Sequence, residues 1–418
     1  MSVKSIVLLF LAFISLTVAL PAPEPPSYES TFNRTACQLP TTNPLDGCPN
    51  GTLLVGLTSN ANFYTIQSAI LSLPNNTTPY TFLILPGNYT EQLNITRPGP
   101  VYLLGQTPTP YSPSFGELQA GDNPGTKNKI IVTWSQATGT ATTGTLDNAF
   151  TSTLTIAPTL NASLTGSGPT GNAVPAGTPF GNTDFRAYNI DFVNDYLPYS
   201  AGPSLALSIS YANAGFYGVG FFSYQDTVYV GKLASVFMRG GTVAGQTDFF
   251  YGFGTAWMQG ISVLLRGCGG GVTAWKGTNS TFVNKYGVYL HESTVRKANK
   301  SLSVVGECAL GRPWNAQHRS IFANCDLDDS IRPSGYIEWS STDPRVNFNT
   351  TMAEYHDKGP GFNLTGRLQA SNVTKLFNDT QYVPYDTPSK VFQYPFSGKY
   401  GNIAWIEKAS LPVGDDLS

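Results

Sequence analysis

The hydrophobic positions of this 418-residue chain predict one short helix followed by many short strands. Between Tyr64 and Leu73 the apolar residues recur at helical spacing, and Pro74 ends the pattern. After it, β-branched, aromatic and aliphatic residues form short runs bounded by turn residues, which predicts strands. These strands are expected at 81–85, 101–104, 129–134, 154–156, 188–193, 205–209, 215–222, 228–230, 236–238, 256–258, 261–265, 287–290, 320–323 and 335–339.

A weak repeat runs through the strand-rich region. Phe216, Phe237 and Trp257 are spaced 21 and 20 residues apart, and Gln225 and Gln246 are 21 apart. A period of about 20 to 25 residues with glycine-rich turns favours a parallel β-solenoid over a doubly wound α/β fold. A β-sandwich or jelly roll is the competing all-β interpretation. In a solenoid, the helix at 64–73 would cap the open end of the core and block edge pairing.

The composition supports a β-rich chain and excludes some partners. Charged residues make up only 12%, about half the usual share, whereas Gly (42) and Pro (30) are frequent. The net charge is −2 and there is no long basic block, so we expect no nucleic-acid partner.

The N-terminus predicts secretion. Lys4 precedes an apolar run, 6–16, that is too short to span a bilayer, and small residues follow, which is typical of a signal peptide cleaved near Ala19 or Ala22. Thirteen glycosylation sequons agree with an extracellular protein, and no further apolar stretch reaches spanning length. The sequons are at Asn33, Asn50, Asn75, Asn76, Asn88, Asn94, Asn161, Asn279, Asn299, Asn349, Asn363, Asn372 and Asn378.

The five cysteines permit disulfides in an oxidising compartment. Cys37 and Cys48 are the simplest pair, since they close a short loop. Among Cys268, Cys308 and Cys325, one is left over if all bonds are intramolecular, and the sequence does not say which. No Cys-X-X-Cys pair occurs and the three histidines are far apart, so we expect no metal site.

Two aspartates carry the candidate chemistry. Asp226 and Asp248 are 22 residues apart, about one solenoid coil. Equivalent positions on successive coils lie about 4.8 Å apart. When two carboxyl groups lie this close together, they cannot both ionise easily, so their pKa values move apart. One carboxyl can then stay charged as a nucleophile while the other keeps a proton as an acid. Ester hydrolysis can use that division of labour. The alternative is a pair of turn aspartates that cap loops.

Three further side chains favour the catalytic interpretation. Gln225 can donate amide hydrogens to an oxyanion beside Asp226. Arg312 can hold a carboxylate with two hydrogen bonds and keep it ionised. Trp314, in the same turn, can lie flat against a sugar ring or can belong to the core.

Five segments, in order, resemble the pectin methylesterases, in particular the secreted fungal branch. They are Thr65–Ile70, Gly87–Glu91, Tyr224–Tyr229, Gly245–Gly252 and Leu310–Trp314, and the resemblance covers about residues 60–370. It implies an all-β fold, a right-handed parallel β-helix, here with a short N-terminal capping helix. The expected segments are a signal peptide (1–19), a Pro-rich segment with two cysteines (20–55), the catalytic β-helix (56–395) and a C-terminal tail (396–418).

The resemblance also implies roles for the candidate residues. Asp248 is the nucleophile towards the C6 methyl ester of galacturonate in pectin, and Asp226 is the proton donor and then the base. Gln225 stabilises the oxyanion, Arg312 holds Asp248, and Trp314 packs on the polysaccharide. The substrate would be methyl-esterified homogalacturonan, the enzyme a secreted monomer without membrane contact, and no cofactor would be needed. We also expect Tyr224, Phe249 and Trp275 to line sugar subsites.

The chain departs from the family pattern at one site position. The family carries another glutamine one coil before the Gln-Asp-Thr motif, and here that position is Pro203. Proline has neither a side-chain amide nor a backbone N–H, so one contact is missing or is supplied elsewhere. The family's Ile-Thr-Ala-Gln-Gly stretch also differs, reading Val-Thr-Ala-Trp-Lys-Gly over residues 272–277.

Other functions remain as alternatives. A pectate lyase would need a calcium-binding carboxylate cluster, and the Asn-Thr-Asp and Gly-His-Gly segments of polygalacturonases do not occur. A serine esterase is disfavoured because there is no Gly-X-Ser-X-Gly motif. The alternative from a different class is a non-catalytic solenoid that binds pectin or the cell wall.

Overall fold

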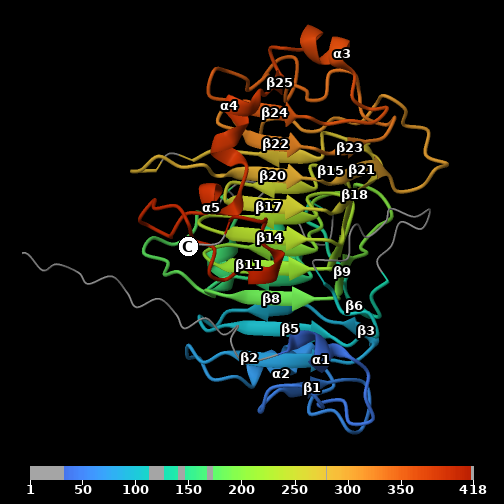
Figure 1. Cartoon of the computed structure of the whole chain (residues 1–418), viewed down its shortest axis with the longest axis vertical. Helices are drawn as coiled ribbons and strands as arrows, with labels where there is room; N and C mark the ends of the chain where they lie inside the picture. The colour runs from blue at the N-terminus through green and yellow to red at the C-terminus, as the bar shows by residue number, and fades with distance from the viewer. Residues whose placement is uncertain (1–32, 113–126, 140–145, 167–172, 279, 416–418) are drawn as a thin grey trace, which may run out of the picture.

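The computed structural model describes residues 33–112, 127–139, 146–166, 173–278 and 280–415. Its strands pair in parallel into three sheets that wind round one core, so the fold is a right-handed parallel β-helix (Figure 1). The sandwich alternative is therefore wrong. The predicted signal peptide lies outside the described residues.

Each full coil gives one strand to each sheet, as β11, β12 and β13 do. The first sheet contains β1 (Leu53–Val55), β2 (Tyr80–Ile84), β5 (Val101–Gly105), β8 (Phe185–Tyr188), β11 (Asn213–Tyr217), β14 (Ser235–Arg239), β17 (Thr255–Gln259), β20 (Gly287–His291), β22 (Arg319–Ala323), β24 (Thr351–Tyr355) and β25 (Lys375–Leu376). The second contains β3 (Gly87–Thr90), β6 (Ile130–Trp134), β9 (Asp191–Asn194), β12 (Gly220–Phe222), β15 (Thr242–Thr247), β18 (Ser262–Gly269), β21 (Thr294–Lys297) and β23 (Asp326–Leu327). The third contains β4 (Leu93–Ile95), β7 (Leu154–Ile156), β10 (Leu207–Ile209), β13 (Val228–Val230), β16 (Phe250–Gly252) and β19 (Thr273–Trp275).

A one-residue turn in the left-handed region separates the first sheet from the second on successive coils. The first residue of this corner has positive φ on seven coils and is Asn189, Gly218, Gly240, Gly260, Glu292, Asn324 or His356; Gly241, directly after Gly240, also has positive φ. Because glycine and asparagine tolerate this conformation best, they occupy five of the seven positions. The turn corrects two predictions, since 188–193 and 215–222 each contain the end of one strand, the corner and a second strand. The strand predicted at 335–339 is also wrong, because that segment has no strand pairing.

The aromatic repeat proved to be out of register by one residue. Phe216 pairs with Met238, whereas Phe237 pairs with Trp257. Phe216 therefore belongs to the core inside the coils, and Phe237 and Trp257 belong to a second apolar cluster on the outer face of the first sheet. The C-terminal segment covers that face with Phe392, Trp405 and other apolar side chains, and Figure 1 shows it lying across β8 to β17.

The predicted helix caps the N-terminal end of the core. It is α2 (Ile66–Leu71), and its apolar residues Ile66 and Ile70 are buried against the first coils. Glu91 accepts hydrogen bonds of 2.8 Å from the backbone N–H groups of Ile66 and Gln67. A carboxylate at a helix N-terminus satisfies unpaired donors, so Glu91 ties the cap to the first coil.

The other helices are short and lie around the coils. They are α1 (Arg34–Gln38), η2 (Asn148–Thr151), η3 (Leu160–Ser163), α3 (Leu364–Gln369), α4 (Asp379–Tyr382), η4 (Val383–Tyr385), α5 (Pro388–Val391) and η5 (Lys408–Ser410). Cys37 and Cys48 form the expected disulfide. The pairing left open by the sequence is Cys268 with Cys308, and Cys325 is a buried free thiol.

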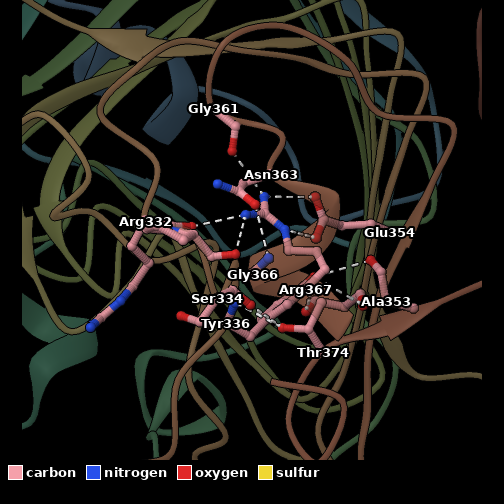
Figure 2. A network of polar contacts seen from close by, with 12 residues as sticks. Arg332, Ser334, Tyr336, Ala353, Glu354, Gly361, Asn363, Gly366, Arg367 and Thr374 are labelled. Carbon is pink, nitrogen blue, oxygen red and sulfur yellow. Dashed lines mark hydrogen bonds and ion pairs between the residues drawn. The ribbon is translucent and has the colours of Figure 1, made fainter. Parts of the chain in front are cut away.

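A buried ion pair fixes α3 over the C-terminal end of the core. Arg367 and Glu354 are both fully buried, and two hydrogen bonds of 2.6 and 3.1 Å join them. The guanidinium also donates to the carbonyl oxygens of Arg332, Pro333 and Gly361, so its donors are satisfied (Figure 2). A paired and fully hydrogen-bonded charge is tolerated in a core, whereas an unpaired one is costly.

We expect Glu354→Gln to destabilise the fold by about 3 kcal/mol, because it removes the carboxylate that makes two hydrogen bonds to the buried Arg367 guanidinium. Urea unfolding of both proteins measures the difference. The matched control is Asp343→Asn, which breaks the exposed Arg345–Asp343 pair and should cost less than about 1 kcal/mol. Equal losses for the two variants would contradict a special role for burial.

Candidate active site

The two aspartates occupy equivalent positions on neighbouring coils. Asp226 lies two residues before β13 and Asp248 two residues before β16, and these strands pair Val228 with Phe250. The Asp226 N–H donates to the Thr247 carbonyl at 3.0 Å, which fixes the register at the turn itself. The 22-residue spacing is therefore one coil, whereas the Gln225–Gln246 spacing is not, because Gln225 bridges to Thr247.

Both aspartates adopt a backbone conformation that side chains other than glycine rarely take. Their φ angles are 60° for Asp226 and 46° for Asp248. Aspartate tolerates the left-handed region better than most residues, and such strain concentrates at functional sites. Both side chains are nevertheless almost buried, at 8% and 7% exposure. Aspartates that only cap loops are not expected to be both strained and buried, so these features favour the catalytic interpretation of the pair.

Arg312 holds Asp248 with two hydrogen bonds. Its Nε donates to Oδ1 at 3.0 Å and its Nη2 donates to Oδ2 at 2.7 Å, while the Gly271 N–H donates to Oδ1 at 3.2 Å. The guanidinium lies 4.1 Å from the ring centroid of Trp339, which limits its movement. Trp339 lies in the segment 335–339, which was wrongly predicted as a strand, so its place beside Arg312 was not predicted from the sequence.

The two carboxyls have different surroundings, which give them different pKa values. Burial raises the pKa of Asp226 well above its ordinary value, the charge of Asp248 raises this pKa further, and Arg312 opposes both. Burial also raises the pKa of Asp248, but the Arg312 hydrogen bonds and charge, with the Gly271 N–H, act to lower it. The pKa of Asp248 thus stays above its ordinary value but is raised less than that of Asp226, so Asp226 is the carboxyl of the pair that holds a proton more strongly.

Gln225 lies beside the pair and is held by a serine. The Ser200 hydroxyl donates to Gln225 Oε1 at 2.8 Å and lies 3.0 Å from Thr247 Oγ1. Since Oε1 is engaged, the Nε2 hydrogens of Gln225 are the donors available to a bound group. Ser200 belongs to the long turn between β9 and β10, and nothing in its sequence context marked it.

Trp314 is half-buried beside the site. Its ring lies 5.7 Å from that of Tyr251, and Lys276 Nζ lies 4.2 Å from its centroid. The expectation for Phe249 and Trp275 is wrong, since both are fully buried in the core and cannot contact a polysaccharide. Tyr224 is half-buried, with the Arg266 guanidinium 4.7 Å from its ring.

One residue at the site was missed altogether. Asn148, on η2, donates through Nδ2 to Asp226 Oδ2 at 3.3 Å and is only 7% exposed. It lies in a Thr-, Gly- and Ser-rich stretch without periodicity, so only the folded arrangement brings it to Asp226.

The described residues show no other kind of centre. Within them, no three His, Cys, Asp or Glu side chains come together in a way that could hold a metal ion. None of the helices in the described part of the chain has the length and apolar character needed to cross a membrane.

Comparison with known proteins identifies the family. A family model for pectinesterase matches residues 172–392, which is more than half of the chain. The chain belongs to the pectinesterase family. Pectinesterases are carboxylic ester hydrolases, so the chain is an enzyme of this class.

Relatives match over most of their own length. The chain is 27% identical to the probable pectinesterase A of Aspergillus niger, over 79% of this chain and 85% of that protein. It is 28% identical to a pectinesterase of Petunia integrifolia, over 87% of this chain and 83% of that protein. A pectin methylesterase variant solved with a hexasaccharide has a TM-score of 0.60 at 24% identity, covering 82% of this chain and 98% of that one, which shows the same fold.

Proposed function

We propose that this enzyme hydrolyses the C6 methyl esters of galacturonate units in pectin and releases methanol, with Asp248 as nucleophile and Asp226 as acid and base. The observation that carries the proposal is the aspartate pair itself. One carboxylate accepts two hydrogen bonds from Arg312, which favour its anion, and the other is buried with its pKa raised well above the ordinary value.

In the first step, an Asp248 carboxylate oxygen attacks the ester carbonyl carbon. The bond from this carbon to the methoxy oxygen then breaks, the Asp226 proton passes to that oxygen, and methanol leaves. The product is an acyl-enzyme anhydride on Asp248, and Asp226 is now ionised. Arg312 keeps the nucleophile charged and aligned before the attack.

In the second step, Asp226 takes a proton from water, and the hydroxide attacks the same carbonyl carbon. The bond to Asp248 breaks, which restores the Asp248 carboxylate and the protonated Asp226 and leaves a galacturonate carboxylic acid that ionises in water. Gln225 Nε2 stabilises the negative oxygen that forms in each step, with Ser200 fixing the amide orientation.

Substrate binding is assigned to the surface around Trp314. This ring is half-buried and offers an apolar face suited to the C–H face of a sugar. The hexasaccharide held by the structural relative belongs to that protein, and it supports a polysaccharide as the substrate class here.

The structure agrees with an extracellular location for the enzyme. The protein has two disulfides, and disulfides form and persist mainly in oxidising compartments. Twelve of the thirteen sequons lie in the described residues, and eleven of their asparagines are exposed, Asn94 being half-buried. Those eleven asparagines are therefore accessible to glycosylation, which supports secretion.

The deciding experiment measures methanol released from highly methylated pectin by the purified full chain, with polygalacturonate as the unesterified control substrate. We expect methanol release from the methylated pectin and none from polygalacturonate. If wild type binds pectin but releases no methanol above buffer, the protein is the non-catalytic pectin-binding solenoid instead.

We expect Arg312→Lys to lower kcat by about 10- to 100-fold, because one ammonium cannot make both hydrogen bonds to Asp248. Losing these contacts also raises the Asp248 pKa, so the acidic limb of the pH–rate profile should move to higher pH. Arg239→Lys, on the first sheet away from the aspartates, is the control. Unchanged kinetics in Arg312→Lys would rule out the proposed clamp.

A further inference from the structure

The position where the family carries its extra glutamine lacks an amide in this chain. Pro203 is held by its backbone, since its carbonyl accepts from the Thr138 N–H at 2.9 Å. The next residue, Ser204, donates its N–H to the Gln225 carbonyl at 3.0 Å. The coil before Gln225 is therefore in place, but its proline side chain offers no donor to the aspartates.

An amide from a more distant coil reaches the same aspartate. Asn148 precedes β7, which is separated from β13 by β10, the strand that follows Pro203. The η2 turn carries its side chain past that coil to within 3.3 Å of Asp226 Oδ2. The distance is at the long end for an N–H···O bond, as is common for catalytic contacts before substrate binds.

The turn that presents Asn148 is firmly held. Asp147 is fully buried, and its carboxylate accepts from the Ala149 N–H at 3.0 Å and the Thr165 hydroxyl at 3.0 Å. Thr151 Oγ1 donates to the Asn148 carbonyl at 2.8 Å and accepts from the Leu205 N–H at 3.1 Å. The Asn148 side chain is thus pre-positioned and joined to the coil that contains Pro203.

Asn148 also has hydrogen-bonding capacity that the fold does not use. Its buried Oδ1 has no hydrogen-bond partner among the described residues. The Asn148 side chain is also in hydrogen-bonding contact with the buried Tyr251 hydroxyl, and this contact lowers the pKa of Tyr251 against the larger raising effect of burial. Buried polar atoms without partners are uncommon, and they cluster where a substrate or water binds.

We propose that Asn148 is the positioning residue for Asp226 and supplies the amide that Pro203 lacks. Its Nδ2 hydrogen bond keeps Asp226 Oδ2 as an acceptor, so the transferable proton sits on Oδ1. The proposal rests on the proposed esterase function, and it replaces the missing family glutamine with a residue from a different coil.

The groups around Asp226 set the expected pH effect. Asp248 on the next coil raises the pKa of Asp226 and Arg312 lowers it, while Tyr251 interacts with the Asp226 charge and Asn148 donates a hydrogen bond to it. A hydrogen bond donated to a carboxylate favours its charged form and lowers its pKa. Removing Asn148 therefore raises the Asp226 pKa and leaves the Arg312 contacts of Asp248 in place.

The test compares Asn148→Ala with Gln92→Ala. Gln92 is the matched structural control, because its amide donates to Phe150 and Ser152 carbonyls next to the same turn without contacting either aspartate. We expect Asn148→Ala to lower kcat by about 10- to 100-fold at unchanged KM and to move only the alkaline limb of the pH–rate profile to higher pH. Gln92→Ala should leave that limb unmoved. Equal shifts in the two variants, or none in Asn148→Ala, would overturn the proposal.

A second-site change and a direct titration keep the test independent of turnover. Pro203→Gln in the Asn148→Ala background restores an amide at the family position, and we expect it to recover at least part of kcat. Carbon-13 NMR of the aspartate carboxyls should show a higher Asp226 pKa in Asn148→Ala than in wild type. If wild type releases no methanol, the esterase function fails, whereas an unchanged Asp226 titration defeats the role of Asn148 itself.

Discussion

Asp248→Asn should abolish methanol release, with kcat at least about 10⁴-fold below wild type, while pectin binding is retained. An amide has no charged oxygen to attack the ester carbonyl, and covalent catalysis stops at its first step. Asparagine is nearly the same size as aspartate, and its carbonyl can still accept from the Gly271 N–H. The turn and the substrate surface around Trp314 should therefore keep their shape.

The measurement pairs a methanol assay with calorimetric binding of methylated oligogalacturonides. Asp329→Asn is the control, because Asp329 is also an ion-paired aspartate but is only half-buried and is bonded to Lys297 rather than Arg312. It should retain wild-type kcat. Activity of Asp248→Asn within tenfold of wild type would exclude Asp248 as the nucleophile, and loss of binding would point to a structural role.

The fold was predictable because the solenoid repeats one physical constraint. Short apolar runs at a period of about 20 residues cannot form a core alone, but they do so when stacked. The exact register was harder to predict. Phe216 and Phe237 look equivalent in sequence, yet one faces the core and the other faces the C-terminal segment. A shift of one residue reverses the face of a strand, and aromatic residues are used on both faces here.

The residues of the candidate site could be predicted only where a reactive side chain stands in a motif at a spacing that matches the coil. Asp226, Asp248 and Arg312 stand in recognisable motifs, and the structure brings them within hydrogen-bonding or charge contact. Asn148 and Ser200 come from irregular turns, whose positions depend on how far each loop reaches across neighbouring coils. The prediction that Trp275 lines a sugar subsite was wrong, because no sequence feature distinguishes a tryptophan in the core from an exposed one.

Asp226→Asn should lower kcat by about 10²- to 10⁴-fold and should also stabilise the protein at neutral pH. The activity loss follows from removing the proton donor and base of the two steps. The stability gain follows from burial, because a carboxyl that resists ionisation destabilises the folded state once the unfolded chain has released its proton. An asparagine carries no such penalty, and its carbonyl oxygen can still accept from Asn148 Nδ2.

The pH dependence gives the sign of the stability effect. The folded pKa of Asp226 is raised above its unfolded value of about 3.9. Below about pH 4 both states hold the proton, so wild type and Asp226→Asn should be equally sensitive to pH. Above it, wild type loses about 1.4 kcal/mol of unfolding free energy per pH unit relative to the variant, until the folded carboxyl ionises. Urea unfolding at pH 4, 5, 6 and 7 measures the divergence. Parallel curves would mean that Asp226 is not held protonated in the folded enzyme, and it could then not act as the first proton donor.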